Sequence, residues 1–341
     1  ATMFGGAFGG TAGEVRPQDE PTELETRVRA SSALPGEWHI PLPTDVVTRL
    51  DATPAPSPVA MPTQPAEFVY VTLNEAGREA SRQTSVVECF SEDLGSGVRL
   101  ELSSIPGGTF RMGLDADPSS RDTRLGPAHD VTVRPFFMGR TPVTQAQWKA
   151  VAGLPMVKTQ LDFDPSYFKG ADRPVEKVSV QDCQEFCARL SRRSGRLYRL
   201  PTEAEWEFAC RSGTDSPFHF GPTITADVAN FDANYLFGGA QKGVFRRETT
   251  PAGSFKVANS FGLFDMHGNV WEWCEDVWHD SYRDAPVDGR AWVTGGDPAQ
   301  CVLRGGSWYG RPDACRSVSR LGLQSDGRNG RTGFRVVMSL F

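Results

Sequence analysis

The sequence predicts an α+β fold made of a few helices, short strands and long irregular loops. Two observations lead to this prediction. The 341 residues include 35 Gly and 25 Pro, which favour turns and loops over a helical bundle. Helical periodicity is confined to one stretch, 144–211, with short strand candidates on both sides of it. We therefore expect two main helices, small twisted antiparallel sheets and much irregular loop.

The N-terminal residues 1–66 are predicted to be an extension that ends in a linker. The stretch 41–66 is rich in Pro, Ala and Thr, a composition typical of extended linkers. Hydrophobic alternation begins directly after it, so we expect one folded domain over 67–341.

Strand candidates open this domain. The segment "EFVYVTL" (67–73) alternates between apolar and polar residues, as a half-buried strand does. Further candidates are "VRLELSSIPGGTFRMG" (98–113) and "HDVTVRPFFMGRTPVT" (129–144). After residue 212 we expect only short strands, turns and long loops.

Helix start and stop signals follow. Thr144 is a candidate cap for a helix that ends at Gly153, and Thr202 with Glu205 forms the T-x-x-E capping box of another helix. Between them, 179–195 has an apolar face with a spacing of three or four, formed by Val180, Cys183, Phe186, Cys187 and Leu190. Ser179 is the candidate cap of this helix and Gly195 its candidate end.

Composition narrows the class of protein. The chain is 39% hydrophobic and 23% charged, an ordinary globular balance. Its net charge of −6 argues against general nucleic-acid binding, and no apolar run reaches the roughly 18 residues that a membrane span needs. The seven cysteines lack C-x-x-C spacing, which indicates neither a disulfide framework nor a zinc site and fits a cytoplasmic protein. The chain starts at Ala1, so a cleaved signal peptide stays open.

Charge is unevenly distributed along the chain. Residues 302–341 hold seven arginines and two aspartates, whereas 265–284 hold six acidic residues. Either these two segments face each other inside one domain, or the arginines face a ligand.

Six segments, in a fixed order, resemble the formylglycine-generating enzyme or sulfatase-modifying factor superfamily. They are "IPGGTFRMG" (105–113), "TPVTQAQW" (141–148), "YRLPTEAEWEFACR" (198–211), "NSFGLFDMHGNVWEWCED" (259–276), "RGGSW" (304–308) and "GFRVV" (333–337). The resemblance covers roughly 68–341, is strongest to a bacterial branch, and implies a C-type-lectin-like fold of the enlarged formylglycine-generating-enzyme type. A family fold fixes activity less well than it fixes architecture.

The resemblance also implies a structural calcium ion. The segment "FDMHGNVWEW" supplies carboxylate oxygens and a Gly-Asn turn, which suit a hard cation. Carried over from similar family members, the ligands are Asp265, Gly268, Val270 and Glu272, with Asn230 at a tentative second calcium site.

The family's oxidase chemistry uses two cysteines that bind copper(I). Aligned on "GGSW", this chain has Gly310 at the first position and Cys315 at the second, so a copper site is not expected. Cys315 remains either a reactive thiol beside arginines or a small buried residue.

The C-terminal segment 304–332 is predicted to present a binding surface. Its positions of mixed chemistry follow no helix or strand periodicity, and variable loops on a rigid scaffold are a binding design. The candidate contacts are Trp308, Tyr309, Arg311, Asp313, Ser319, Leu321, Leu323, Asn329 and Arg331. We expect a non-catalytic domain that binds a protein or a small ligand. Some similar family members are variable proteins diversified by retroelements. The alternatives are a copper-dependent formylglycine-generating oxidase or related oxidative enzyme, and a structural or assembly subunit.

Overall fold

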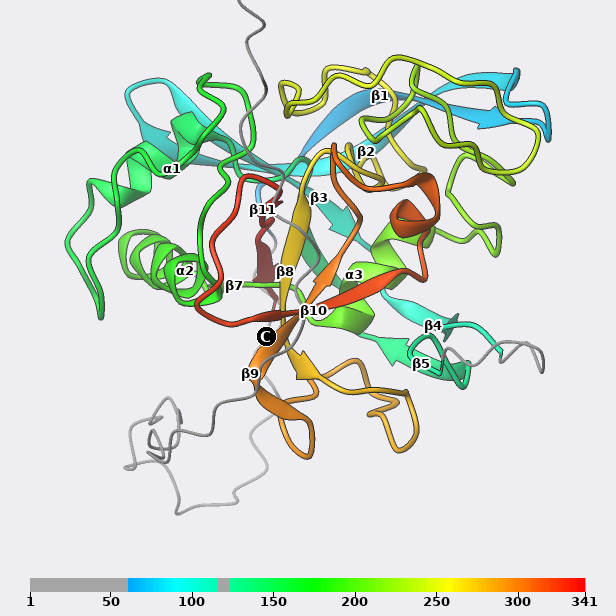
Figure 1. Ribbon diagram of the computed structural model, residues 1–341. Coiled ribbons are helices and arrows are strands. Elements are labelled where there is room, and N and C mark those ends of the chain that lie inside the picture. The colour runs from blue at the N-terminus through cyan, green and yellow to red at the C-terminus, as the bar shows by residue number, and fades with distance from the viewer. Residues whose placement is uncertain (1–60, 116–122, 341) are drawn as a thin grey trace, which may run out of the picture. The chain divides into compact units, whose positions relative to one another are not determined.

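The computed structural model describes residues 61–115 and 123–340 (Figure 1). The predicted extension lies almost entirely outside these residues. The first strand, β1 (Gln64–Leu73), begins three residues before the predicted domain boundary at 67. In the described residues, no helix is long and apolar enough to cross a membrane.

A six-stranded sheet forms the centre of the domain, in the order β1-β2-β3-β6-β12-β7, and all its neighbouring strands are antiparallel. The remaining members are β2 (Glu79–Gly95), β3 (Val98–Ile105), β6 (Phe136–Gly139), β12 (Val337–Ser339) and β7 (Tyr198–Arg199). The predicted strand segments form β1, β3 and β6. The long β2 was not predicted, because much of it is exposed and its apolar residues alternate only near its end.

A second sheet carries the C-terminal part of the chain, in the order β10-β9-β8-β11. Its strands are β8 (Trp271–Trp278), β9 (Asp297–Arg304), β10 (Arg320–Gln324) and β11 (Thr332–Gly333). Its larger pairings are antiparallel, as predicted, and the two-residue β11 alone runs parallel to its neighbour, with Thr332 opposite Trp271 of β8. A third sheet pairs β4 (Gly108–Met112) with β5 (His129–Val133).

Three α-helices occur in the described residues, one more than the two main helices expected. They are α1 (Gln145–Ala152), α2 (Val180–Ser194) and α3 (Glu203–Arg211). The predicted caps Thr144, Ser179 and Thr202 all form capping boxes, and Gly195 ends α2 in the left-handed conformation. A short 3-10 helix, η1 (Pro312–Cys315), lies in the C-terminal segment.

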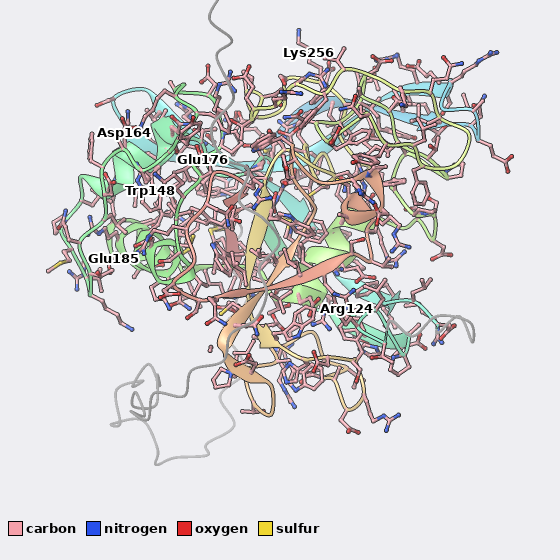
Figure 2. All side chains as sticks on the ribbon, viewed as in Figure 1. Arg124, Trp148, Asp164, Glu176, Glu185 and Lys256 are labelled. Carbon is pink, nitrogen blue, oxygen red and sulfur yellow. The ribbon has the colours of Figure 1, made fainter. Side chains whose placement is uncertain are left out.

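The main core lies where α1 and α2 pack on the central sheet. Trp148 of α1, labelled in Figure 2, stacks on Phe186 of α2 with ring centroids 5.7 Å apart. Phe334 meets both rings edge-on. Cys183 and Cys187 are fully buried in the same cluster, as predicted. Because Phe334 belongs to the "GFRVV" segment, the end of the chain is anchored in this core.

Candidate binding surface

The C-terminal segment leaves the second sheet through a glycine pair. β9 ends at Arg304, and Gly305 and Gly306 follow with φ of 96° and 78°. A Cβ on Gly306 would come within 2.5 Å of the Cys315 Sγ. The pair is therefore required both for its left-handed backbone and for the close approach of η1.

Buried arginines anchor the C-terminal segment 304–332 to helix α3. Arg304 pairs with Glu207, and its guanidinium also donates to the backbone carbonyls of Ser317, Val318 and Ser319. Arg320 forms a two-point pair with Glu203, at 2.7 Å for each N–O contact. Both glutamates belong to α3, outside the acidic segment 265–284 with which these arginines were expected to pair.

Arg335 does meet the acidic segment. Its guanidinium contacts both carboxylate oxygens of Glu272, at 2.6 and 2.7 Å. Both side chains are completely buried, and Trp206 Nε1 donates to the same carboxylate at 2.7 Å. Of the two interpretations of the arginines in 302–341, pairing with acidic residues inside the domain therefore describes the buried ones.

Cys315 is buried beneath the loop. Burial, with the Asp313 carboxylate as a second cause, raises the pKa of the Cys315 thiol to about 12. The Cys315 carbonyl lies 2.7 Å from His267 Nδ1, and the His267 ring is itself buried. Of the two interpretations of Cys315, the structure favours the packed residue over the reactive thiol, because a nucleophile needs an accessible thiolate.

Gly310, which the motif alignment assigned to the family's first cysteine position, lies at a turn. Its amide donates to the Ser307 carbonyl at 2.9 Å, and its carbonyl accepts from the Asp232 amide at 2.9 Å. Backbone contacts alone hold this position. Across residues 61–115 and 123–340, no group of three or more His, Cys, Asp or Glu side chains is arranged to hold a metal ion.

The predicted calcium ligands do not all fit a cation. Both oxygens of Glu272 accept from Arg335, so a cation there would compete with a guanidinium. Asp265 Oδ2 accepts from the Gly253 amide at 2.8 Å, and burial raises the pKa of this carboxyl to about 6. The Glu272–Arg335 pair thus argues against calcium bound at Glu272.

At Asn230, one observation does suit a cation. Its Oδ1 is buried without a hydrogen-bond partner, whereas its Nδ2 donates to the Glu248 carbonyl and to Asn269 Oδ1. Buried oxygens without a partner are uncommon, and a hard cation or a water would satisfy this one. Calcium at Asp265, Gly268 and Val270, and at the second site at Asn230, stays a prediction.

Above these buried contacts lies a chain of aromatic rings, which we call the aromatic face. It comprises Tyr167, Phe168, Phe245, Trp308 and Tyr309. Phe168 and Tyr309 each lie 5.3 Å from the Trp308 ring, and Phe245 lies 6.2 Å from it. Tyr167 extends the chain at 4.9 Å from Phe168. Trp308 itself is half-buried and donates from Nε1 to the Gly330 carbonyl at 2.9 Å.

Two arginines contact rings of the aromatic face, and a third, Arg311, lies two residues along the chain from Tyr309. Arg331 lies 5.0 Å from the Tyr309 ring centre and Arg247 lies 5.5 Å from the Phe245 ring centre. Arg311 covers Tyr235 at 4.2 Å. All three arginines are exposed. The structure therefore brings together four of the predicted contact residues: Trp308, Tyr309, Arg311 and Arg331.

The other predicted contact residues have different surroundings. Asp313 is exposed on η1, but Ser319 is buried and donates to the Asp313 carbonyl at 2.7 Å. On β10, Leu321 is 37% exposed, while Leu323 is half-buried against the main core. Asn329 caps a turn, with Oδ1 accepting from the amide of Arg331 and the hydroxyl of Thr332.

Sequence reasoning missed the partners that complete the aromatic face. Tyr167, Phe168, Tyr235, Phe245 and Arg247 come from loops far from the C-terminal segment in the sequence. Figure 1 shows the orange loop after β9 beside the yellow-green loops that contain residues 235–247. The only signal for them in the sequence is their residue type, because exposed aromatic and arginine residues are enriched at binding surfaces.

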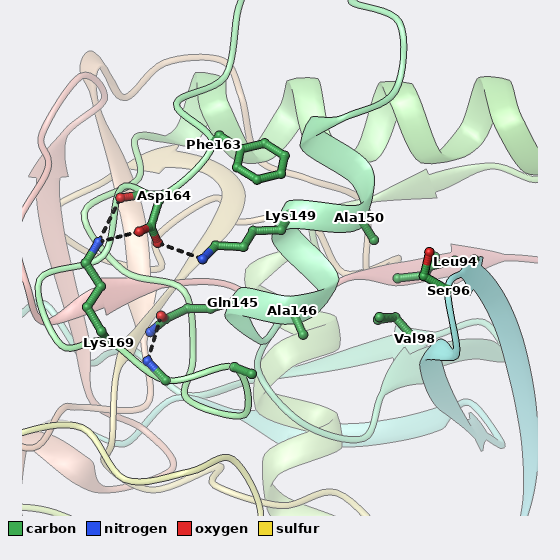
Figure 3. Close-up of a pocket in the computed structure, with 13 residues that line it drawn as sticks. Leu94, Ser96, Val98, Gln145, Ala146, Lys149, Ala150, Phe163, Asp164 and Lys169 are labelled. Carbon is green, nitrogen blue, oxygen red and sulfur yellow. Dashed lines mark hydrogen bonds and ion pairs between the residues drawn. The ribbon is translucent and has the colours of Figure 1, made fainter.

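A separate hollow of about 570 Å³ lies between α1, the β2–β3 turn and the loop 163–171 (Figure 3). Its charged groups neutralise one another, because Asp164 pairs with Lys149 at 3.2 Å and with Lys169 at 3.1 Å. No predicted contact residue lines it.

Comparison with known proteins identifies relatives of this chain in sequence and in structure. A model of the sulfatase-modifying factor enzyme 1-like domain matches residues 98–340. A formylglycine-generating enzyme of Mycobacterium tuberculosis is 30% identical, over 70% of this chain and 97% of that protein. An inactive C-alpha-formylglycine-generating enzyme 2 of Bos taurus is 29% identical, over 71% and 89%. The solved structure of Treponema denticola variable protein 1 is 26% identical with a TM-score of 0.60, over 73% of this chain and 98% of that one.

Proposed function

The chain belongs to the sulfatase-modifying factor enzyme 1-like family, and from this premise we propose that it is a non-catalytic binding protein. Segment 304–332 presents the binding surface, completed by the loops that carry Tyr167, Phe168 and Phe245. The observation that carries this proposal is the aromatic face with its exposed arginines, directly above a fully packed scaffold.

The former catalytic position supports a role without chemistry. Gly310 offers no thiol, and Cys315 is buried with a raised thiol pKa, so two thiolates are not presented to a soft metal ion. The family also contains a protein named inactive, which is similar over most of its length.

The same geometry suits diversification of the segment. The side chains of Tyr309 and Arg311 make no hydrogen bond or ion pair within the described residues, so their replacement leaves the scaffold intact. We propose that these positions vary between related copies, as in retroelement-diversified proteins. A template repeat with adenine-specific mismatches near the coding region supports this; a complete genome without one contradicts it.

The binding proposal is tested by affinity capture from the native host with quantitative mass spectrometry. We expect the double variant Tyr309→Ala/Arg311→Ala to lose the captured partner while its stability stays within about 0.5 kcal/mol of the parent chain. A matched control, Arg283→Ala/Val293→Ala, changes two exposed residues of the β8–β9 connection. Equal capture by both variants contradicts the proposed surface.

A further inference from the structure

The arginines bordering the aromatic face differ from most arginines of the domain in having no acidic partner. Arg247, Arg311 and Arg331 make no ion pair and no side-chain hydrogen bond within the described part of the chain. Some exposed arginines elsewhere are paired, such as Arg82 with Glu79 at 2.6 Å and Arg328 with Asp182 at 2.8 Å, whereas exposed Arg78, Arg193 and Arg283 contact neither an acidic side chain nor an aromatic ring within the described residues. The chain has acidic residues to spare, with a net charge of −6, yet none neutralises these three.

Each of the three guanidinium groups is held over an aromatic ring. Arg311 lies 4.2 Å from the centre of the Tyr235 ring, and Arg331 lies 5.0 Å from that of Tyr309. Such a contact restricts the side chain without using its N–H groups as donors to an acceptor. The donors remain available to carboxylates, which guanidinium groups bind with two parallel hydrogen bonds.

The aromatic side chains supply the second part of a recognition surface. Tyr309 is 50% exposed and Tyr167 is 70% exposed, while Trp308 between them is fixed by its hydrogen bond to Gly330. Rigid, half-buried aromatic anchors bordered by arginines are typical hot spots of protein interfaces. Such anchors favour a partner that offers apolar contacts as well as negative charge.

From these observations we infer that the aromatic face binds an acidic polypeptide segment, whose carboxylates meet Arg247, Arg311 and Arg331 while an apolar side chain packs among Phe245, Trp308 and Tyr309. This inference rests on the proposed binding function and adds the chemical class of the partner. A nucleic acid is the disfavoured anion, because nucleic-acid binding usually needs an extended basic footprint, whereas this chain has a net charge of −6 and the aromatic face offers only three arginines.

The test pans a phage-display library of random linear peptides on the full chain. The parent chain should enrich peptides that carry Asp and Glu beside an apolar residue. A triple variant, Arg247→Glu/Arg311→Glu/Arg331→Glu, should bind these peptides at least about tenfold more weakly and enrich basic peptides instead. The matched control, Arg78→Glu/Arg193→Glu/Arg283→Glu, changes exposed arginines elsewhere by the same charge and should select as the parent does.

The outcomes separate the inference from the binding proposal. Enriched peptides without acidic bias that are lost in Tyr309→Ala overturn the acidic partner but keep the surface. Peptides that bind Tyr309→Ala as well as the parent chain overturn the surface itself. Failure to enrich any peptide, or tighter binding of a single-stranded oligonucleotide than of the selected peptides, also overturns the inference of an acidic polypeptide.

Discussion

Five of the seven arginines in residues 302–341 form two groups with opposite surroundings. Arg304, Arg320 and Arg335 are buried and bound to glutamates. Arg311 and Arg331, between them in sequence, are exposed and contact only aromatic rings. The same residue type thus serves the scaffold at some positions and faces solvent at others a few residues away.

This difference shows how a fold can keep its scaffold while its surface changes. A buried ion pair is costly to break, because removal of one partner leaves an unpaired charge out of water. An exposed arginine has no such constraint, so its replacement changes recognition with little change in stability. Substitutions in the two groups should therefore differ widely in their cost to stability.

Replacement of Arg335 by Met should destabilise the protein most. It leaves the Glu272 carboxylate buried with only Trp206 as a side-chain donor, and such a loss typically costs about 3–5 kcal/mol. Denaturant unfolding measures the change. Arg331→Met is the matched control, with an expected cost below about 0.5 kcal/mol. Similar costs for the two variants would remove the distinction between the groups.

Gly306→Ala should cost about 3 kcal/mol, by a steric route. The added methyl group meets Cys315 Sγ, and the left-handed backbone is itself unfavourable for alanine. Gly213→Ala serves as the control, because its φ of 89° is similar but no atom lies within 4 Å of the added Cβ. Its expected cost is about 1 kcal/mol, from the backbone alone. Thermal unfolding of both variants separates strain from packing.

The buried histidines beneath the loop predict a loss of stability in acid. Burial lowers the pKa of His267 to about 4 and that of His219 well below its usual value, and both ring nitrogens of His219 lack a hydrogen-bond partner. The two histidines therefore bind protons near pH 6.5 in the unfolded chain but stay neutral there in the folded chain. The histidine contribution is complete above pH 6.5 and is lost as the pH falls toward 4.

Three carboxyls act in the opposite direction. Burial raises the pKa of Asp265 to about 6 and those of Glu275 and Asp276 to about 7, so their contribution falls as the pH rises. The difference in stability between His219→Phe and the parent chain is independent of these carboxyl groups, because both proteins contain them. The variant should gain about 1 kcal/mol or more of relative stability between pH 7.5 and pH 5. An unchanged difference would mean that His219 is not held neutral in the fold.

Calcium removal should have the smallest effect. Because Arg335 already neutralises Glu272, we expect EDTA to lower stability by less than about 1 kcal/mol, or roughly 2–4 °C in Tm. Re-addition of calcium, with magnesium as control, shows whether any shift is specific. A larger, calcium-specific shift that Asn230→Ala abolishes would place the cation at Asn230, whereas one that survives this substitution would mean that the cation displaces the guanidinium from Glu272.

The local features of this protein follow from short, contiguous stretches of its sequence. The caps Thr144, Ser179 and Thr202 and the apolar face of α2 are set by residues three or four apart, so the helices were predictable. The order of the family motifs likewise predicted the fold, because each motif is contiguous. The interpretations of Cys315 and Gly310 also came from one contiguous stretch of the sequence.

The contacts between distant side chains, in contrast, became visible only in the tertiary structure. It paired Arg320 with Glu203 and placed Phe245 beside Trp308, contacts that join residues far apart in the sequence. It also turned Ser319 inward and left Arg311 exposed, although both lie on the same segment. Burial and pairing of this kind depend on how separate loops pack together, and no local pattern of residues specifies that packing.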